Sequence, residues 1–264
     1  MNIVSYFWYE VLGRPYKLAR TVDEGTGQPI LLIHGLGTNA ATWQPLVEQI
    51  DKLRFHIIGF DLLGFGLSPK PSNRAYDVAD HAKSIIASLN RRDRKQKFII
   101  IGHSMGCLIA SHIATVRPDL VSRLILYEPP LFADSIEFRS HARRKRLYFA
   151  FYENLLKRPS LLFKYSKLVA RVAEGRMVAL EPALWLPFER SLQNTIMKQQ
   201  SYTELKTIKL PTDIIYGSFD LMVTRAEVKK MLRENKFVRF HLVNEMHDVS
   251  PRAAKFINKL LKQI

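Results

Sequence analysis

The sequence predicts an α/β fold, with a mostly parallel central sheet, helices on both faces of the sheet and an inserted all-helical segment. Between about residues 15 and 127, short apolar runs typical of strands alternate with helical stretches, which is the pattern of a parallel sheet covered on both sides. Between residues 131 and 205 the alternation stops, and prolines divide a stretch without convincing strands into short helices. We therefore expect a core formed by 1–130 and 206–264, and a helical cap subdomain formed by 131–205.

The individual elements are marked by short apolar runs and by residues that begin or end helices. Aspartate, serine and threonine cap helix N-termini, and proline ends a helix or occupies its first position. The expected strands are 30–33, 56–60, 98–101, 124–127, 213–216 and 238–243. The expected helix boundaries are Asp77 as the N-cap of a helix over about 76–90, Pro118 after a helix over about 104–116, a capping box at 224–227, and Ser250 as an N-cap followed by Pro251.

The composition is that of an ordinary globular protein. The chain has 264 residues, of which 47% are apolar and 24% charged, which excludes a disordered, collagen-like or coiled-coil protein. The single cysteine, Cys107, has no intrachain partner, which fits a reducing compartment. Residues 1–13 have no basic residue ahead of their apolar stretch, and 98–114 is too short and too polar for a membrane helix. We expect a cytoplasmic protein without stable membrane insertion.

The charge is strongly positive, with 40 Lys and Arg against 24 Asp and Glu, a formal net charge of +16. Such a surface attracts acidic substrates, anionic membranes or nucleic acid, or it serves solubility alone. The longest basic run, 91–97, precedes a predicted strand, and no nucleic-acid motif accompanies it. We expect a solvated basic exterior around a mainly apolar pocket, and no nucleic-acid partner. The aromatic run 6–9 could touch a membrane interface or pack on the cap.

The strongest motif is Gly102-His103-Ser104-Met105-Gly106, between a predicted strand and a predicted helix. It fits the G-x-S-x-G pattern, in which a sharp turn from strand to helix exposes the serine hydroxyl above the sheet. The pattern alone is common by chance, but its position between strand and helix favours a function. We therefore predict Ser104 as a catalytic nucleophile.

A serine hydroxyl needs a neighbouring base, usually histidine, to become nucleophilic. In this architecture the triad runs in the chain order serine, acid, histidine, so only three histidines lie late enough in the chain: His141, His241 and His247. His141 falls in the helical insert and His241 inside a predicted strand, whereas His247 lies in the loop just after that strand. The base is therefore predicted to be His247.

The third member of such a triad is an acid that orients the histidine. Asp220 follows the strand 213–216 by a short turn, at the sheet edge where active sites of open α/β sheets gather. Asp213 begins the same strand and so lies at the wrong end, and Asp248 adjoins the histidine and is expected to face away. Glu128, after the strand 124–127, is the alternative acid.

The reaction also needs two N–H groups to stabilise an oxyanion. One is expected from Met105, after the nucleophile, and the other from Leu36, in the glycine-rich segment 34–37 that follows the first predicted strand. His34 precedes Ser104 in the chain, and we interpret it as a buried residue that holds this loop. Cys107 is interpreted as a small core residue.

Together these motifs resemble the α/β-hydrolase fold family, in its small esterase-like form with a helical cap. The resemblance rests on 34–37, on the segment 61–68 (Asp61-Leu62-Leu63-Gly64-Phe65-Gly66-Leu67-Ser68), on the elbow at Ser104, and on Asp220 and His247 in the family's order. It implies that 61–68 is a structural turn near the site and that the insert covers the pocket. Haloalkane dehalogenases and epoxide hydrolases carry aspartate where this chain has the elbow serine, and proline iminopeptidases carry tryptophan after that serine.

The resemblance implies a serine hydrolase that cleaves carboxylic esters through an acyl-enzyme, acting on a small-molecule ester or acyl substrate without cofactor or metal. Two alternatives stay open. The same triad serves carbon–carbon bond hydrolysis of a diketone, and the fold also occurs in ligand-binding proteins with little turnover. The sequence does not determine the natural substrate or the oligomeric state.

Overall fold

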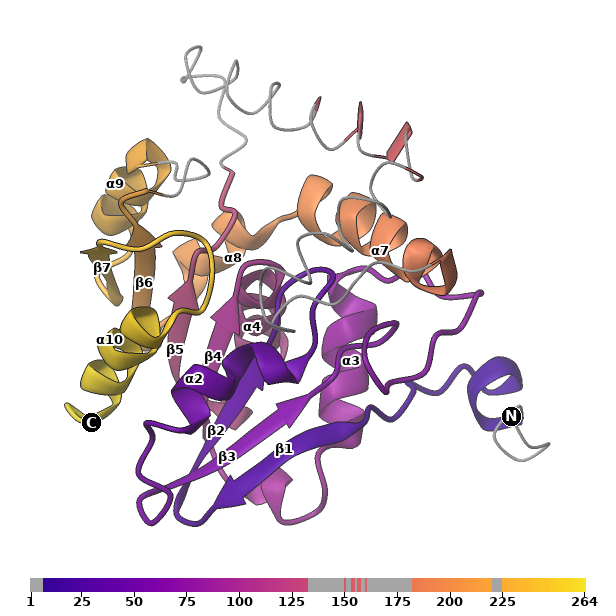
Figure 1. Ribbon diagram of the computed structural model, residues 1–264, viewed down its shortest axis with the longest axis horizontal. Helices are drawn as coiled ribbons and strands as arrows, with labels where there is room; N and C mark the ends of the chain where they lie inside the picture. The colour runs from indigo at the N-terminus through magenta and orange to yellow at the C-terminus, as the bar shows by residue number, and fades with distance from the viewer. Residues whose placement is uncertain are drawn as a thin grey trace.

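The computed structural model describes residues 7–132, 182–219 and 225–264, with a few isolated positions between 150 and 160. Its centre is a seven-stranded sheet in the order β1-β3-β2-β4-β5-β6-β7. Only the edge strand β1 is antiparallel to its neighbour, and the other pairs are parallel (Figure 1). This arrangement confirms the α/β fold class that the alternating sequence pattern predicts.

The strands and helices have the following bounds. The strands are β1 (Arg20–Gly25), β2 (Gln28–Ile33), β3 (Phe55–Phe60), β4 (Phe98–His103), β5 (Val121–Tyr127), β6 (Thr212–Gly217) and β7 (Val238–Val243). The α-helices are α2 (Gln44–Val47), α3 (Val78–Ser88), α4 (Met105–Val116), α7 (Trp185–Ser191), α8 (Ser201–Thr207), α9 (Arg225–Glu234) and α10 (Pro251–Leu261). Short 3₁₀ and π segments are η1 (Phe7–Val11), η2 (Ala40–Trp43), η3 (Asp93–Lys95), η4 (Pro118–Leu120), η5 (Pro182–Leu184) and η6 (Leu192–Met197).

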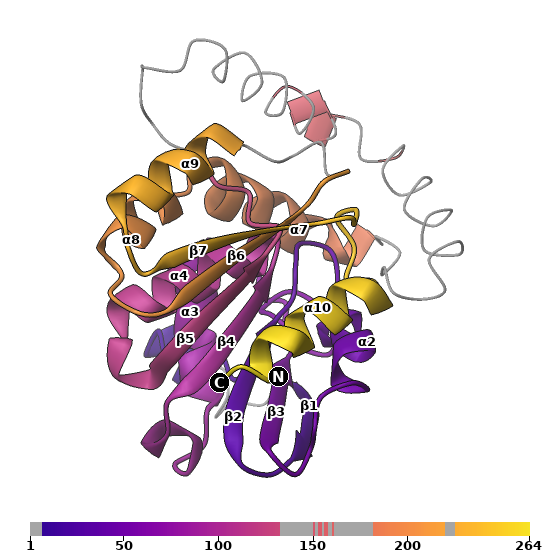
Figure 2. The same ribbon diagram turned by 90° about the vertical axis from the view of Figure 1, so that its left-hand side faces the viewer.

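The hydrophobic core lies in two layers, one on each face of the sheet. Side chains of a strand point alternately to opposite faces, so Ile30 and Leu32 of β2 join the layer under α2 and α10, while Leu31 and Ile33 join the layer under α3, α4, α8 and α9. Figure 2 shows these two groups of helices on opposite sides of the sheet. The central strands are buried on both faces, which explains their continuous apolar sequences.

Six of the seven strands match the predicted apolar runs. Strand β1 has no apolar run that would predict it, because its sequence Arg-Thr-Val-Asp-Glu-Gly is polar and only Val22 is buried. The predicted caps of two helices are confirmed: Asp77 accepts a hydrogen bond from Asp80 N, and Ser250 accepts one from Ala253 N. Of the capping box at 224–227, residue 224 and the side chains of 225–227 lie outside the described residues.

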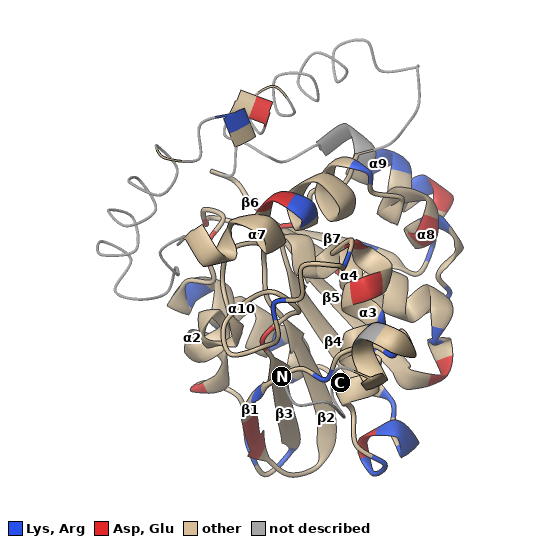
Figure 3. Cartoon of the chain, turned by 90° about the vertical axis from the view of Figure 1, so that its right-hand side faces the viewer, with Lys and Arg blue, Asp and Glu red and all other residues tan. Residues whose placement is uncertain are grey.

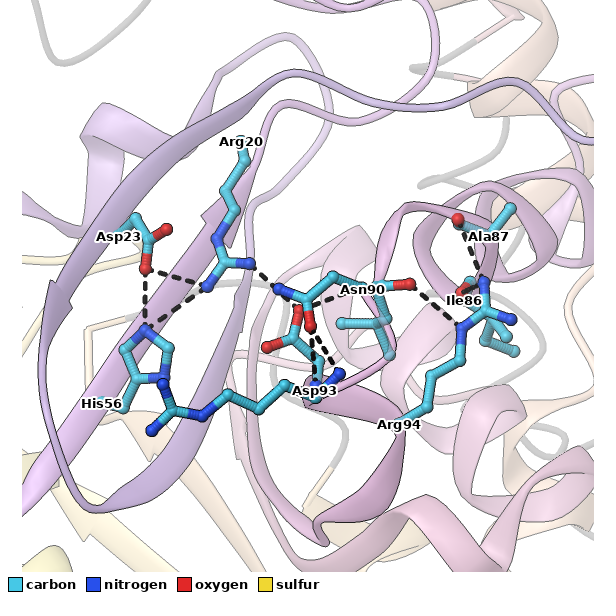
Figure 4. Close-up of polar contacts among 10 residues, drawn as sticks. Arg20, Asp23, His56, Ile86, Ala87, Asn90, Asp93 and Arg94 are labelled. Carbon is cyan, nitrogen blue, oxygen red and sulfur yellow. Dashed lines mark hydrogen bonds and ion pairs between the residues drawn. The ribbon is translucent and has the colours of Figure 1, made fainter.

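The polar edge strand is joined to the loop after α3 through a buried carboxylate. Asp93 accepts hydrogen bonds from Arg20 Nη1 at 3.0 Å and from Asn90 N at 3.0 Å, as Figure 4 shows. Beside it, Arg94 donates from its Nε to Leu89 O and from Nη2 to Ile86 O, at the C-terminal end of α3. Cations are favourable at this end of a helix, so one member of the basic run 91–97, Arg94, binds the end of α3.

The described end of the insert lies over the carboxyl edge of the sheet and against the core. A Cβ added at Gly37 would contact the ring of Phe188, and one added at Gly64 would collide with Pro187, so α7 packs directly on the loops after β2 and β3. Further along, Glu204 of α8 pairs with His112 of α4 at 2.6 Å. The division into a core and a cap at 131–205 stays a prediction.

Within the described part of the chain, no helix is both long and apolar enough to cross a membrane.

Strands β5, β6 and β7 share a buried ionic contact that should stabilise the fold. Asp213 accepts from Arg123 Nη2 at 2.6 Å and from His241 Nε2 at 2.8 Å. Burial opposes ionisation of Asp213, but the hydrogen bond from His241 and the charge of Arg123 outweigh it, so its pKa lies below the ordinary value.

Asp213→Asn should therefore lower the free energy of unfolding by about 3 kcal/mol at neutral pH, because Arg123 and His241 lose a charged partner. Urea unfolding measures this loss. Since a depressed pKa stabilises only above the unfolded value of 3.8, the difference from the unchanged protein should shrink as pH falls below it. Asp119→Asn, which removes the exposed partner of Arg117, is the control and should cost much less. Equal losses in the two variants would contradict the assignment.

Candidate active site

Ser104 lies at the junction between β4 and α4, in a backbone conformation that side chains rarely adopt. Its φ is 52° and its ψ is −120°. Residues outside the favoured backbone regions are held there by the surrounding structure and cluster at functional sites. This is the geometry expected of a serine at a sharp turn from strand to helix.

The turn also brings Ser104 to the surface. Every other residue from Phe98 to Ser111 is buried, whereas Ser104 is partly exposed. The glycines of the motif make the turn possible: a Cβ at Gly102 would collide with the backbone of Cys107, and one at Gly106 would collide with the carbonyl of Ile33. The motif thus lets α4 pack tightly against the ends of β2 and β4 and leaves the Ser104 hydroxyl accessible.

The loop after β2 lies directly against the nucleophile. Strand β2 pairs with β4, so their carboxyl ends are neighbours, and a Cβ added at Gly35 would lie 3.2 Å from Ser104 Cβ. Leu36, the predicted second donor, is half-buried in this loop. Met105, the predicted first donor, is the first residue of α4, where backbone N–H groups have no acceptor within the helix. Both predicted donors therefore lie on segments adjoining Ser104, and their role stays a prediction.

His34 fixes this loop, as expected from its place in the sequence. Its ring is fully buried, Nε2 accepts from Leu62 N at 2.8 Å, and Nδ1 donates to Gly35 O at 2.8 Å. Burial lowers the pKa of His34 to about 4, although the hydrogen bond to Gly35 opposes this. The ring is consequently neutral, with its proton on Nδ1, and ties the loop after β2 to the loop after β3.

The loop after β3 is held by a second buried group. Asp61 accepts from Ala40 N at 2.9 Å and from Leu67 N at 2.8 Å, and is 3% exposed. Gly66, with a φ of 50°, packs against this carboxylate, where a Cβ would collide with it. The segment 61–68 is thus a tight turn built around one carboxylate.

His247, the predicted base, lies half-buried in the loop after β7, and two aromatic side chains hold that loop. His103 Nε2 donates to His247 O at 2.8 Å. Tyr127 OH lies 2.9 Å from Met246 O and 2.9 Å from Asp248 O, and the rings of Tyr127 and His103 stack at 5.7 Å. The carbonyls of residues 246, 247 and 248 are thereby bound by His103, which precedes the nucleophile, and by Tyr127, which ends β5.

The predicted acid, Asp220, lies outside the described residues, but the two residues before it are described. Ser218 N donates to Val243 O at 2.7 Å and Phe219 N donates to Glu245 O at 3.2 Å. The backbone leading to Asp220 is therefore joined to the loop that carries His247.

Glu128, the alternative acid, directly follows β5 at the same edge and is 1% exposed. Its Oε1 accepts from Gly217 N at 2.5 Å, and its φ is 54°. The carboxylate thus holds the end of β6, where the segment towards Asp220 begins.

His241 and Cys107, which the sequence also offered for consideration, are held in structural contacts. His241 lies within β7 and pairs with Asp213 at the amino end of β6, away from the edge that carries Ser104. The Cys107 thiol is buried and donates to Gly102 O at 3.1 Å; burial, assisted by the nearby Glu128, raises its pKa. Among the described residues, no group of His, Cys, Asp and Glu is arranged to hold a metal ion.

Sequence reasoning missed His103 and Tyr127, which hold the His247 loop. They contact it across 144 and 119 residues of chain. The one available signal was their position, since each is the last residue of a strand that ends at the carboxyl edge of the sheet, beside Ser104.

The comparisons with known proteins bear on the family and the fold. The chain matches, over residues 28–241, the family model described as alpha/beta hydrolase fold. Among curated proteins, it is 36% identical over 122 residues to the probable lysophospholipase BODYGUARD 4 of Arabidopsis thaliana, covering 45% of this chain and 29% of the relative. It is 34% identical over 131 residues to the (E)-2-((N-methylformamido)methylene)succinate hydrolase of Acinetobacter baylyi, covering 49% and 46%. The chain spans less than half the length of either relative.

Solved structures extend the likeness over almost the whole chain. A thermophilic esterase from Thermogutta terrifontis superposes with a TM-score of 0.69 and 22% identity, covering 93% of this chain and 92% of the esterase. At this identity the likeness concerns the fold alone.

Because His34 is buried in its neutral form, the free energy of unfolding should depend on pH. Its folded pKa of about 4 lies below the ordinary 6.5, so the unfolded chain binds the proton first. The free energy of unfolding should therefore fall as pH drops from 6.5 towards 4, with His34 contributing about 3 kcal/mol of that loss. Chemical unfolding at a series of pH values measures the slope. In His34→Asn the slope should be shallower, whereas parallel profiles for the two proteins would contradict the assignment.

Proposed function

Because the chain belongs to the α/β-hydrolase fold family, we propose that it is a serine hydrolase of carboxylic esters, with Ser104 as nucleophile, His247 as base and Asp220 as the acid that orients the base. One observation carries the proposal: Ser104 is the partly exposed residue of an otherwise buried strand–turn–helix, in a strained conformation beside the Gly35 loop. A serine that only capped a helix would need neither the strain nor that close neighbour.

The proposed reaction proceeds in two halves. His247 takes the proton of the Ser104 hydroxyl while the oxygen attacks the ester carbonyl, and the N–H groups of Leu36 and Met105 stabilise the oxyanion. The imidazolium then gives its proton to the leaving alcohol, which leaves an acyl group on Ser104. Water, deprotonated by His247, attacks this acyl-enzyme and releases the acid. Neither a cofactor nor a metal takes part.

The fixed backbone of the loop that carries His247 supports this chemistry. Proton transfer needs the base within about 3 Å of the hydroxyl, so small displacements of its loop cost rate. His103 fixes the carbonyl of His247, and Tyr127 fixes the carbonyls on both sides of it. Residues 218 and 219 join the segment before Asp220 to the same loop.

The pocket itself is proposed to lie between this edge and the cap at 131–205, of which α7 contributes Phe188 next to the Gly37 loop. One relative is named a probable lysophospholipase and the other a hydrolase of a substituted succinate, which supports a small-molecule substrate. p-Nitrophenyl esters of increasing acyl length would define the preferred acyl chain. A diketone that is cleaved faster than every ester would favour the carbon–carbon hydrolase alternative.

Ser104→Ala should abolish ester hydrolysis and leave the fold intact, because only a surface hydroxyl is lost. A fluorophosphonate probe should label the unchanged protein at Ser104 and leave the variant unlabelled, as mass spectrometry would measure. Ser122→Ala is the control: its hydroxyl donates to Phe98 O at the far end of β5, so activity and labelling should persist. Full turnover by Ser104→Ala, with no adduct on Ser104, would disprove the mechanism.

Asp220→Asn and Glu128→Gln distinguish the two candidate acids. Asp220→Asn should lower kcat about 10⁴-fold, by loss of the correct histidine tautomer. Glu128→Gln keeps an oxygen that can accept from Gly217 N and should lose far less activity. Steady-state kinetics on a p-nitrophenyl ester, with circular dichroism to confirm folding, would measure both. The reverse ranking would make Glu128 the acid.

A further inference from the structure

A cavity lies away from Ser104, between η1 and the helices α3 and α4. Its volume is about 880 Å³. Trp8 and Tyr9 of η1, Ile86 and Ala87 of α3, and Val116 of α4 form its apolar lining. None of the predicted catalytic residues lines it, so the proposed hydrolase mechanism assigns it no role.

The short η1 segment is attached to the core by one side and is exposed on the other. Tyr9 stacks on the buried Tyr16 with ring centroids 4.3 Å apart, and Arg74 donates to Tyr9 O at 2.8 Å. With this side fixed, large apolar side chains face solvent: Phe7 is 52% exposed, Trp8 48%, Val11 60% and Leu12 47%. Four exposed apolar side chains within six residues form a patch of the kind that marks an interaction site.

The same cavity is lined by basic residues. Arg14, Lys17 and Lys83 line it, are exposed, and have no acidic partner among the described side chains. The guanidinium group of Arg14 lies over the Trp8 ring, 5.8 Å from its centroid, so a cation and an exposed aromatic side chain are in contact.

Two further basic residues line the cavity and already have partners. Arg94 is bonded to carbonyls of α3, and Arg117 is paired with Asp119. The cavity lining contains no Asp or Glu among the described side chains; Asp80, in a smaller cavity beside it, accepts from the backbone N–H groups of Ala75 and Tyr76.

Basic residues continue beyond the cavity. The run 91–97, which contains Arg94, follows α3 on this side of the molecule, and Figure 3 shows Lys and Arg clustered there. The face therefore combines an anchored aromatic segment with unpaired cations and a basic margin. Such a combination is complementary to a surface that is anionic outside and apolar beneath.

We propose that this face binds reversibly to the surface of an anionic phospholipid bilayer. Phe7, Trp8 and Val11 enter the interfacial region, while Arg14, Lys17 and Lys83 contact headgroup phosphates. Aromatic rings prefer this depth of a bilayer, and each basic residue near an anionic surface strengthens binding about fivefold. Binding of this kind needs no membrane-spanning segment.

Co-sedimentation of the full chain with vesicles tests the proposal. The protein should sediment with vesicles of equal parts phosphatidylglycerol and phosphatidylcholine, sediment far less with phosphatidylcholine alone, and be released by roughly 0.5 M salt, which shortens the Debye length. The triple variant Arg14→Gln, Lys17→Gln, Lys83→Gln should bind about 100-fold more weakly. The matched control Lys255→Gln, Lys259→Gln, Lys262→Gln removes three exposed charges from α10 and the residue that follows it, on the opposite side of Figure 1 from η1, and should bind almost normally.

The apolar contribution is tested separately. Phe7→Ser with Trp8→Ser should weaken vesicle binding at least tenfold, while Leu53→Ser with Leu242→Ser, which alters two exposed apolar residues elsewhere, should not. Hydrolysis of a soluble ester and thermal unfolding should be unchanged in all four variants, so the result is independent of the catalytic proposal. Equal losses in the control variants, equal binding to neutral vesicles, or binding to an RNA oligonucleotide but to no vesicle would each overturn the proposal.

Discussion

The active edge of this protein depends on how closely helix α4 approaches strands β2 and β4. At Gly102 and Gly106 there is no room for a Cβ, because the backbone of one element lies against the backbone of the next. A larger residue at either position would push α4 away and relax the turn that holds Ser104 in its strained conformation. The strain is thus maintained by packing over the whole core, since α4 is buried along most of its length.

The loops around Ser104 are held by buried polar groups. His34 and Asp61 are both buried, and between them they bond the segments after β2 and β3. Buried polar groups are costly unless every bond is made, so such a network selects one arrangement of the loops over its alternatives. On the other side of the site, His103 and Tyr127 act in the same way on the His247 loop. The proposed catalytic residues therefore stand on short segments whose positions are set by side chains from the core.

Much of this architecture follows from local sequence, and the rest follows from contacts between distant residues. The central strands could be predicted because burial on both faces requires continuous apolar runs, whereas β1 is a polar edge strand whose identity comes from pairing with β3. Ser104 and His247 could be singled out by motif, chain order and position. The anchoring role of Tyr127 could not, because it depends on carbonyls more than a hundred residues away. Asp220 was placed by strand order alone, and Glu128 at the same edge shows why strand order leaves two acids to choose between.

The surroundings of Cys107 have a practical consequence for handling the protein. It is the only cysteine in the chain, its thiol is buried beside Gly102 and Tyr127 carbonyls, and its pKa is raised by burial. Alkylating reagents and peroxide attack the thiolate, so this sulfur is protected because it is buried and because its raised pKa keeps it protonated. A cysteine introduced at a chosen surface position would then be the single reactive thiol, available for a fluorophore or spin label without first removing the native one.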